Sequence, residues 1–271
     1  MESPWSLVTW PYDIARELVE VAATGLVIPF GRSPTSWIPE RQIGAVAEHQ
    51  VGGHRIPVVL VHGYGGTRSS WSALREQLAL DGFATVHEMS YRTVASQVPD
   101  VARALVRDCH DVMERAGSDR VHLVGHSLGG VVVRYAVQRA GLAPHAATAI
   151  TVAAPHRGTL AALFCSGELA ASLRPGSRLL LDLRREAREG TVRWVSFYSD
   201  RDLVVPPHSA RLEDTALRAT NILVPGVGHL GILRAPLFLS SAVRILSDDS
   251  ALGELLAAGW TGGPRREADV A

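Results

Sequence analysis

Apolar residues are arranged along the chain in two patterns. Short continuous apolar runs are typical of fully buried strands, and apolar residues that recur every three or four positions are typical of helices. Runs of the first kind lie at 55–63, 84–91, 119–124, 146–153, 192–198 and 221–224. Helices are predicted after the first of these, through Leu80, and at 101–116, 131–138 and 236–246. Because buried strands alternate with helices, we predict an α/β fold with a mostly parallel sheet of about six strands flanked by helices.

Composition narrows the classes of protein that fit this pattern. The 271 residues are 46% apolar, which is enough for a sizeable core, and the formal net charge is +0. Because the charges are balanced and dispersed, nucleic acid is not expected as a partner. The two cysteines, Cys109 and Cys165, have neither a metal-binding nor a CxxC spacing, and we expect free thiols. The histidines outside the motifs described below are scattered without metal-ligand spacing, so no metal is expected.

The N-terminal sequence does not have the features of a secretory signal. No Lys or Arg precedes Arg16, and acidic residues interrupt the apolar positions. The most continuous apolar segment, 21–30, contains Gly25 and Pro29 and is shorter than the roughly 20 residues that span a bilayer. These features predict a cytoplasmic protein without a transmembrane segment, with peripheral membrane association left open.

The sequence Gly125-His126-Ser127-Leu128-Gly129 follows a predicted strand and precedes a predicted helix. A serine between glycines at such a strand-to-helix turn is typical of a nucleophile elbow. Side chains at Gly125 or Gly129 are expected to collide with the neighbouring strand or helix. Ser127 then presents its hydroxyl at the N-terminal end of a helix, where unpaired N–H groups favour a developing oxyanion.

A nucleophilic serine needs a base that takes its proton and a carboxylate that orients the base. Asp202 and His229 each follow a predicted strand, as Ser127 does, so all three are expected at the same edge of the sheet. Asp200 is the alternative acid. The alternative bases are His126, whose side chain we expect to point away from the serine, and the turn histidines, for which bracing of loops is the simpler role: His62 and His156.

Five motifs occur in an order that resembles the α/β-hydrolase superfamily, and more narrowly the small bacterial triacylglycerol lipases (class 2 lipases) and esterases. They are Val-His-Gly-Tyr-Gly-Gly at 61–66, Gly-His-Ser-Leu-Gly-Gly at 125–130, Pro-His-Arg-Gly-Thr at 155–159, Asp-Leu-Val-Val-Pro at 202–206 and Gly-Val-Gly-His-Leu-Gly at 226–231. The resemblance covers residues 56–247. It implies an α/β-hydrolase fold and a chain order of nucleophile, acid and base.

Position by position, the resemblance implies that Ser127 is the nucleophile, Asp202 the acid and His229 the base. It also implies an oxyanion hole formed by the backbone N–H groups of Tyr64 and Leu128. The implied activity is hydrolysis of acyl esters through an acyl-serine intermediate, with no cofactor and no metal. The same triad also fits a thioesterase or an acyltransferase, and a non-catalytic binding protein is the alternative from another class.

The segment 159–190, between the fourth and fifth predicted strands, is interpreted as a short lid or helical insert. It contains apolar residues expected to bind the substrate: Leu160, Leu163 and Phe164. The simpler alternative is that two amphipathic helices pack on the sheet. The partners expected are an ester or lipid substrate and transiently a lipid surface, and the oligomeric state stays open.

Three regions are expected along the chain. Residues 1–50 are interpreted as an N-terminal helical extension on or beside the domain, because 11–26 has helical periodicity and 33–39 has the composition of a connector. This helix either docks on the domain or lies at a lipid surface, although its mostly acidic charge disfavours lipid. Residues 51–259 are expected to form the catalytic domain, and 260–271 a flexible tail.

Overall fold

The computed structural model describes residues 54–93 and 96–247. The helix predicted at 11–26 and the tail predicted at 260–271 lie outside the described residues. The domain division predicted from the sequence therefore stays a prediction at both ends of the chain.

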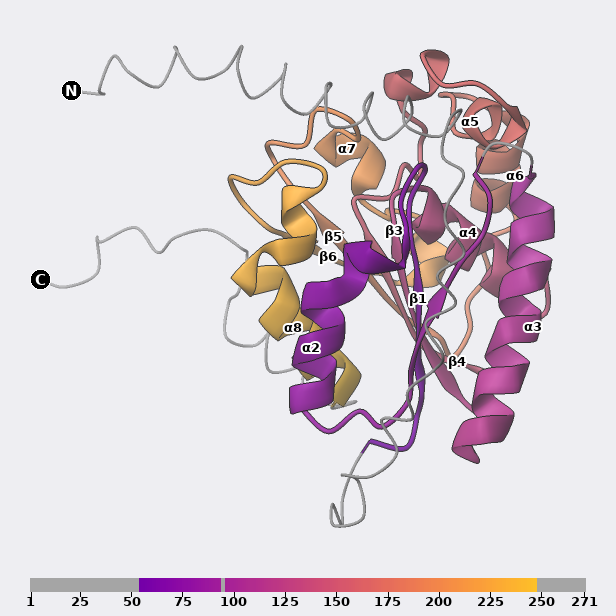
Figure 1. Ribbon diagram of the computed structural model, residues 1–271. Coiled ribbons are helices and arrows are strands. Elements are labelled where there is room, and N and C mark those ends of the chain that lie inside the picture. The colour runs from indigo at the N-terminus through magenta and orange to yellow at the C-terminus, as the bar shows by residue number, and fades with distance from the viewer. Residues whose placement is uncertain (1–53, 94–95, 248–271) are drawn as a thin grey trace, which may run out of the picture.

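The described residues form a six-stranded sheet in the order β2-β1-β3-β4-β5-β6 (Figure 1). Every neighbouring pair is parallel, which confirms the prediction of a mostly parallel sheet. The strands are β1 (Val58–Val61), β2 (Val86–Met89), β3 (Val121–His126), β4 (Ala146–Val152), β5 (Arg193–Tyr198) and β6 (Thr220–Leu223).

Alternate residues of each strand pack into two separate cores, one on each face of the sheet. Val59 and Val61 of β1 pack in the same cluster as residues of α3 (Val98–Ala116) and α4 (Leu128–Arg139). Val58 and Leu60 pack instead in the cluster that contains residues of α2 (Ser72–Leu80) and α8 (Pro236–Ser247). Figure 1 shows these two helix pairs on opposite sides of the sheet. Because both faces are covered, the central strands β1, β3 and β4 are buried along their whole length.

The strand order reverses between β1 and β3. The chain passes from β1 outward to β2, then returns to the other side of β1 with β3 and continues outward through β4, β5 and β6. In open α/β sheets, ligands bind beyond the carboxyl ends of the strands at such a reversal. β3 ends at His126, so this position belongs to Ser127.

Two helices begin earlier than their apolar spacing predicted. α3 begins at Val98 rather than at 101, because Pro99 is compatible with the first turn of a helix. α4 begins at Leu128, directly after Ser127, rather than at 131. None of the helices within 54–93 and 96–247 has the length and apolar content needed to cross a bilayer.

The segment 159–190 folds as a helical insert, as predicted, and it contains three short helices where the alternative interpretation had two. They are η3 (Leu160–Leu163), α5 (Glu168–Ser172) and α6 (Arg178–Arg185). Further short helices that periodicity did not predict are η2 (Arg68–Trp71), α7 (Pro207–Ala210), η4 (Thr215–Leu217) and η5 (Gly231–Arg234). Segments of about one turn are too short to establish a period, which is why sequence spacing does not reveal them.

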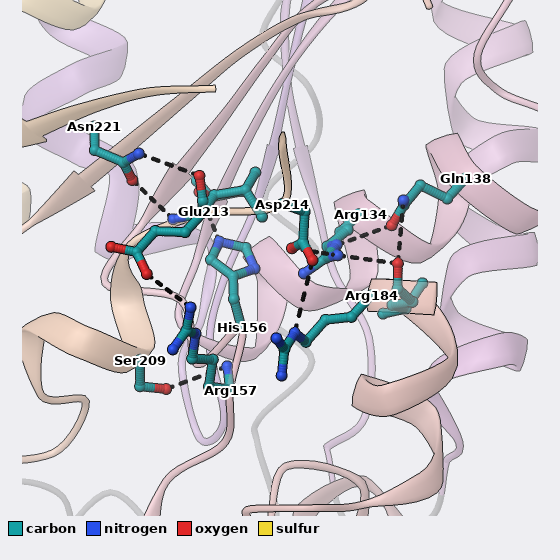
Figure 2. A network of polar contacts seen from close by, with 12 residues as sticks. Arg134, Gln138, His156, Arg157, Arg184, Ser209, Glu213, Asp214 and Asn221 are labelled. Carbon is teal, nitrogen blue, oxygen red and sulfur yellow. Dashed lines mark hydrogen bonds and ion pairs between the residues drawn. The ribbon is translucent and has the colours of Figure 1, made fainter. Parts of the chain in front are cut away.

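A buried arginine attaches the insert to the helix that follows the nucleophile (Figure 2). Arg134 of α4 is fully buried, and its Nη2 donates to the Leu183 carbonyl at 3.0 Å and to the Asp214 carboxylate at 2.8 Å. Leu183 lies in the last turn of α6, where carbonyls lack partners within the helix and attract a cation. Arg184 also pairs with Asp214, at 3.6 Å. The C-terminal end of α6 is thereby attached to α4 through Arg134 and to Asp214 through Arg184.

Candidate active site

Ser127 occupies a strained turn between β3 and α4. Its φ is 52° and its ψ is −121°, a conformation that costs free energy for a residue with a side chain. A Cβ on Gly125 would lie 2.5 Å from the Gly129 carbonyl oxygen, and a Cβ on Gly129 would lie 2.1 Å from the Val61 carbonyl oxygen. The collisions expected from the sequence therefore occur with backbone atoms, which have no room to move. Only glycine at both positions allows the turn.

His229 and Asp202 form a buried pair next to this turn. The Nδ1–H of His229 donates to Oδ2 of Asp202 at 2.8 Å, and both side chains are almost fully buried. Oδ1 of Asp202 accepts the backbone N–H groups of Val204 at 2.9 Å and Val205 at 2.8 Å. Because the carboxylate holds the proton on Nδ1, the other ring nitrogen of His229 is left as an acceptor. That is the tautomer that a general base requires.

Asp200, the alternative acid, lies elsewhere. Its Oδ1 accepts the backbone N–H of Gly226 at 2.7 Å, and the residue is exposed. This bond joins the end of β5 to the loop that carries His229. Asp200 therefore holds the loop of the histidine, whereas Asp202 contacts the histidine ring.

His62 lies under the turn that follows β1. Its Nδ1 contacts the Gly63 carbonyl at 2.9 Å, and its ring stacks on Tyr91 with centroids 4.4 Å apart. The Tyr91 hydroxyl donates to the His62 carbonyl at 2.6 Å. Burial lowers the pKa of His62 from its ordinary value. These contacts match the bracing role considered for this turn histidine.

His156 is buried and lies between Glu213 and Arg134 in the view of Figure 2. Its Nε2 lies 3.1 Å from the Thr151 hydroxyl. Burial, with a smaller contribution from the nearby Arg134 cation, holds the pKa of His156 well below its ordinary value. The neighbouring Arg157 pairs with Glu213 at 2.7 Å, so the 155–159 motif is fixed on its outer side as well.

The expectation that the His126 side chain points away from Ser127 stays a prediction, and the structure places this side chain beside His229. His126 is among the residues that line the cavity of Ser127, and its ring lies 4.8 Å from the ring of His229, centroid to centroid. Its Nε2 is 3.0 Å from the backbone carbonyl oxygen of His229, and no motif in the sequence indicated this bond.

The two backbone N–H groups implied as an oxyanion hole lie on either side of Ser127. Leu128 is the first residue of α4, so its N–H has no partner within the helix. In the turn after β1, the Gly66 N–H donates to the Gly63 carbonyl and the Gly65 N–H to the Thr93 hydroxyl. Among the described residues, the Tyr64 N–H makes no such bond. A Cβ on Gly63 would lie 3.0 Å from Cβ of Ser127, so this turn packs directly on the nucleophile.

A cavity of about 150 Å³ opens at these residues. Its walls contain Ser127, His229, Tyr64 and small or apolar side chains, most of them from the insert: Thr159, Ala161, Ala162, Cys165, Ala170, Leu173, Val204 and Leu230. No Asp, Glu, Lys or Arg is among the described residues that line it. The cavity is therefore suited to an uncharged, mostly apolar group.

The three insert residues predicted to bind substrate do not line this cavity. Leu160, Leu163 and Phe164 have exposed fractions of 67%, 54% and 90%. A 3-10 helix has three residues per turn, so Leu160 and Leu163 share its outer edge while Ala161 and Ala162 face inward. Substrate contacts of these three residues stay a prediction, but the structure gives their places on the inner face of η3 to Ala161 and Ala162.

The all-parallel sheet, the elbow and the histidine–carboxylate pair define an α/β-hydrolase. The mature Bacillus licheniformis lipase BlEst2 superimposes with a TM-score of 0.64 over 73% of this chain and 94% of that chain, at 18% identity. A Paleococcus ferrophilus monoacylglycerol lipase gives a TM-score of 0.55 over 71% of this chain and 95% of that chain, at 19% identity. At these identities the likeness shows the fold alone.

Sequence similarity shows the family. Residues 57–209, more than half of the chain, match the palmitoyl protein thioesterase family, and the protein belongs to it. A triacylglycerol lipase of Burkholderia plantarii is 33% identical over 124 residues, which are 42% of this chain and 34% of the relative. A triacylglycerol lipase of Pseudarthrobacter phenanthrenivorans is 33% identical over 114 residues, 39% of this chain and 34% of the relative. The chain thus spans about a third of the length of these relatives.

Proposed function

We propose that the protein is a serine hydrolase that cleaves acyl esters through an acyl-serine intermediate. The observation that carries this proposal is the buried bond of 2.8 Å between His229 and Asp202, in the wall of the cavity that also contains Ser127. Ser127 is the nucleophile, His229 the general base and Asp202 the carboxylate that orients it.

In the first half of the reaction, the Ser127 hydroxyl oxygen attacks the acyl carbonyl carbon while His229 takes the hydroxyl proton. The carbonyl π-electrons move onto its oxygen, and the N–H groups of Tyr64 and Leu128 donate to that oxyanion. Removal of one such donor costs about 10²–10³ in turnover in related chemistry. The tetrahedral intermediate then expels the alcohol, which receives the proton from His229.

In the second half, a water molecule attacks the acyl-serine and gives its proton to His229. The intermediate collapses to a carboxylic acid, and the proton returns to the Ser127 oxygen. Asp202 keeps the ring of His229 oriented throughout, because its two oxygens accept three N–H groups and hold the carboxylate in place. Proton transfer by His229 contributes roughly 10²–10⁴-fold.

The cavity chemistry favours an acyl substrate of lipid type. Its lining is free of formal charge, and the alanines from the insert leave room for methylene groups. Leu160, Leu163 and Phe164 are exposed beside it and form an apolar rim. We propose that this rim contacts a lipid surface, because contiguous exposed apolar residues mark such contacts.

Thioester hydrolysis is the second candidate, and the palmitoyl protein thioesterase family favours it. The triad chemistry is the same, except that a thiolate leaves in place of an alkoxide. A thiolate needs less protonation as it leaves than an alkoxide does. The two activities therefore use the same residues and differ in how much proton donation by His229 they require.

The test compares wild type with Ser127→Ala on three substrates: p-nitrophenyl butyrate, p-nitrophenyl palmitate and palmitoyl-CoA. Loss of the nucleophile is expected to lower turnover by about 10⁶-fold on every substrate that the wild type cleaves. Faster cleavage of palmitate esters than of palmitoyl-CoA supports the lipase-type activity, and the reverse supports a thioesterase. Equal turnover in both variants would refute the role of Ser127.

A further inference from the structure

Two hydrogen bonds hold the loop that carries His229 at residues that precede the histidine. The Asp200 carboxylate accepts the Gly226 N–H at 2.7 Å, and the Ser199 hydroxyl donates to the Val227 carbonyl at 2.6 Å. Both bonds attach the loop to the end of β5. They fix the loop relative to the side of the sheet that provides Asp202, but not relative to the nucleophile.

The bond from His126 connects this loop to the elbow. A backbone carbonyl oxygen only accepts hydrogen bonds, so the contact of 3.0 Å means that the His126 Nε2 carries a proton and donates it. His126 is 3% exposed, and Trp71 packs edge-on against its ring. Burial, together with the nearby His229, lowers the pKa of His126 to about 3. The ring is therefore neutral, and it remains a donor throughout the neutral range.

We propose that His126 is a positioning residue that sets the spacing between the nucleophile and the base. Residue 126 is joined to Ser127 by one peptide bond, and its side chain binds the backbone of His229 itself. The nucleophile and the base are thus connected by a short path that includes one hydrogen bond. Displacement of the His229 loop would break that bond.

This role rests on the proposed hydrolase activity and extends it. His126 does not contact the reacting atoms and takes no proton, so its removal acts through the geometry of His229. A displacement of about 1 Å in a reacting group can cost on the order of 10²-fold in rate. The expected loss is in kcat, because most of the small and apolar residues that line the cavity come from the insert 159–190 and not from the elbow.

The test is a matched pair of variants, His126→Gln and His126→Asn. A glutamine amide nitrogen reaches about as far as the Nε2 of histidine, so this variant retains a donor for the His229 carbonyl. An asparagine amide reaches only about as far as Nδ1 and loses the bond. Both substitutions are polar and neither titrates, so they differ mainly in reach.

The measurements are kcat and KM on p-nitrophenyl butyrate and the rate of Ser127 labelling by a fluorophosphonate. Each kcat is divided by the number of sites that the fluorophosphonate titrates, so that unfolded molecules are not counted. His126→Gln is expected within about threefold of wild type. His126→Asn is expected to lose about 10–10² in kcat and in labelling rate, with KM within about twofold.

Two results would overturn the positioning role: equal activity per titrated site in both variants, or a loss in His126→Asn that lies in KM alone. If wild type is neither labelled nor active on an ester or thioester, the proposed function fails instead. The two failures are therefore distinguishable.

Discussion

The Asp202→Asn substitution gives the most direct test of the histidine–carboxylate pair, because the structure fixes how the new amide must lie. At the position of Oδ1, the N–H groups of Val204 and Val205 point inward at 2.9 Å and 2.8 Å. Only the amide oxygen can accept them, so the amide NH₂ occupies the position of Oδ2. It then faces Nδ1 of His229, which lies 2.8 Å away in the wild type.

A donor at that position forces the wrong tautomer on the histidine. Nδ1 must accept from the NH₂ group, so the ring proton moves to Nε2, and Nε2 can no longer take the proton of Ser127. The same change in a serine protease triad of unrelated fold lowers kcat by about 10⁴-fold. That factor corresponds to about 5 kcal/mol of transition-state stabilisation. Folding stability changes little, because the two backbone bonds at Oδ1 persist.

The assay is kcat on p-nitrophenyl butyrate, with thermal unfolding recorded on the same samples. Asp200→Asn is the matched control, since its amide oxygen can still accept the Gly226 N–H and we expect activity within about threefold of wild type. The reasoning is refuted if Asp202→Asn stays within tenfold of wild type. It is also refuted if the control loses as much activity as Asp202→Asn.

Stability is expected to decrease as pH falls below about 6.5, because three buried histidines have lowered pKa values and bind protons more readily in the unfolded chain: His62, His126 and His156. The free energy of unfolding should therefore fall between pH 7 and 5, and pH-independent urea unfolding across this range would contradict the expectation. Gly129→Ala is expected to yield little folded protein by circular dichroism, because its Cβ would meet a backbone oxygen at 2.1 Å. Ala153→Gly is expected to raise the free energy of unfolding in urea by up to about 1 kcal/mol, because Ala153 has a φ of 49°; a loss of stability would count against strain at this residue. Phe164→Ser is expected to lower turnover on emulsified palmitate esters more than on dissolved butyrate, and Leu80→Ser, which alters another highly exposed apolar residue on α2, is expected to change neither.

Much of the fold follows from local features of the sequence. Buried strands have no polar face, so their apolar runs predicted a mostly parallel sheet with helices on both faces, and the structure confirms it. Gly125 and Gly129 indicated the elbow because steric exclusion of a Cβ is a local property. The starts of α3 and α4 were predicted about three residues late, because the first turn of a helix need not carry the apolar spacing.

The sequence predicted only part of the candidate site. The order of Ser127, Asp202 and His229 along the chain placed them at one edge of a parallel sheet. Two aspartates lie close together after β5, and the structure separates them: Asp202 binds the ring of His229, and Asp200 binds the backbone of its loop. The turn after β5 is irregular, so the side chains of these two aspartates point in different directions. No rule of sequence spacing predicts those directions.

The sequence by itself determined the sheet, the elbow and the set of residues that reach its edge, because strand burial and glycine sterics act within a few neighbouring positions. Tertiary structure alone decided which face of η3 lines the cavity. Ala161 therefore lies in the cavity wall, and Leu160 is exposed to solvent. It also decided that His126 binds the His229 carbonyl across 103 positions of the chain. Such contacts depend on how loops from separate strands pack, and their partners are distant in sequence, so no local pattern encodes them.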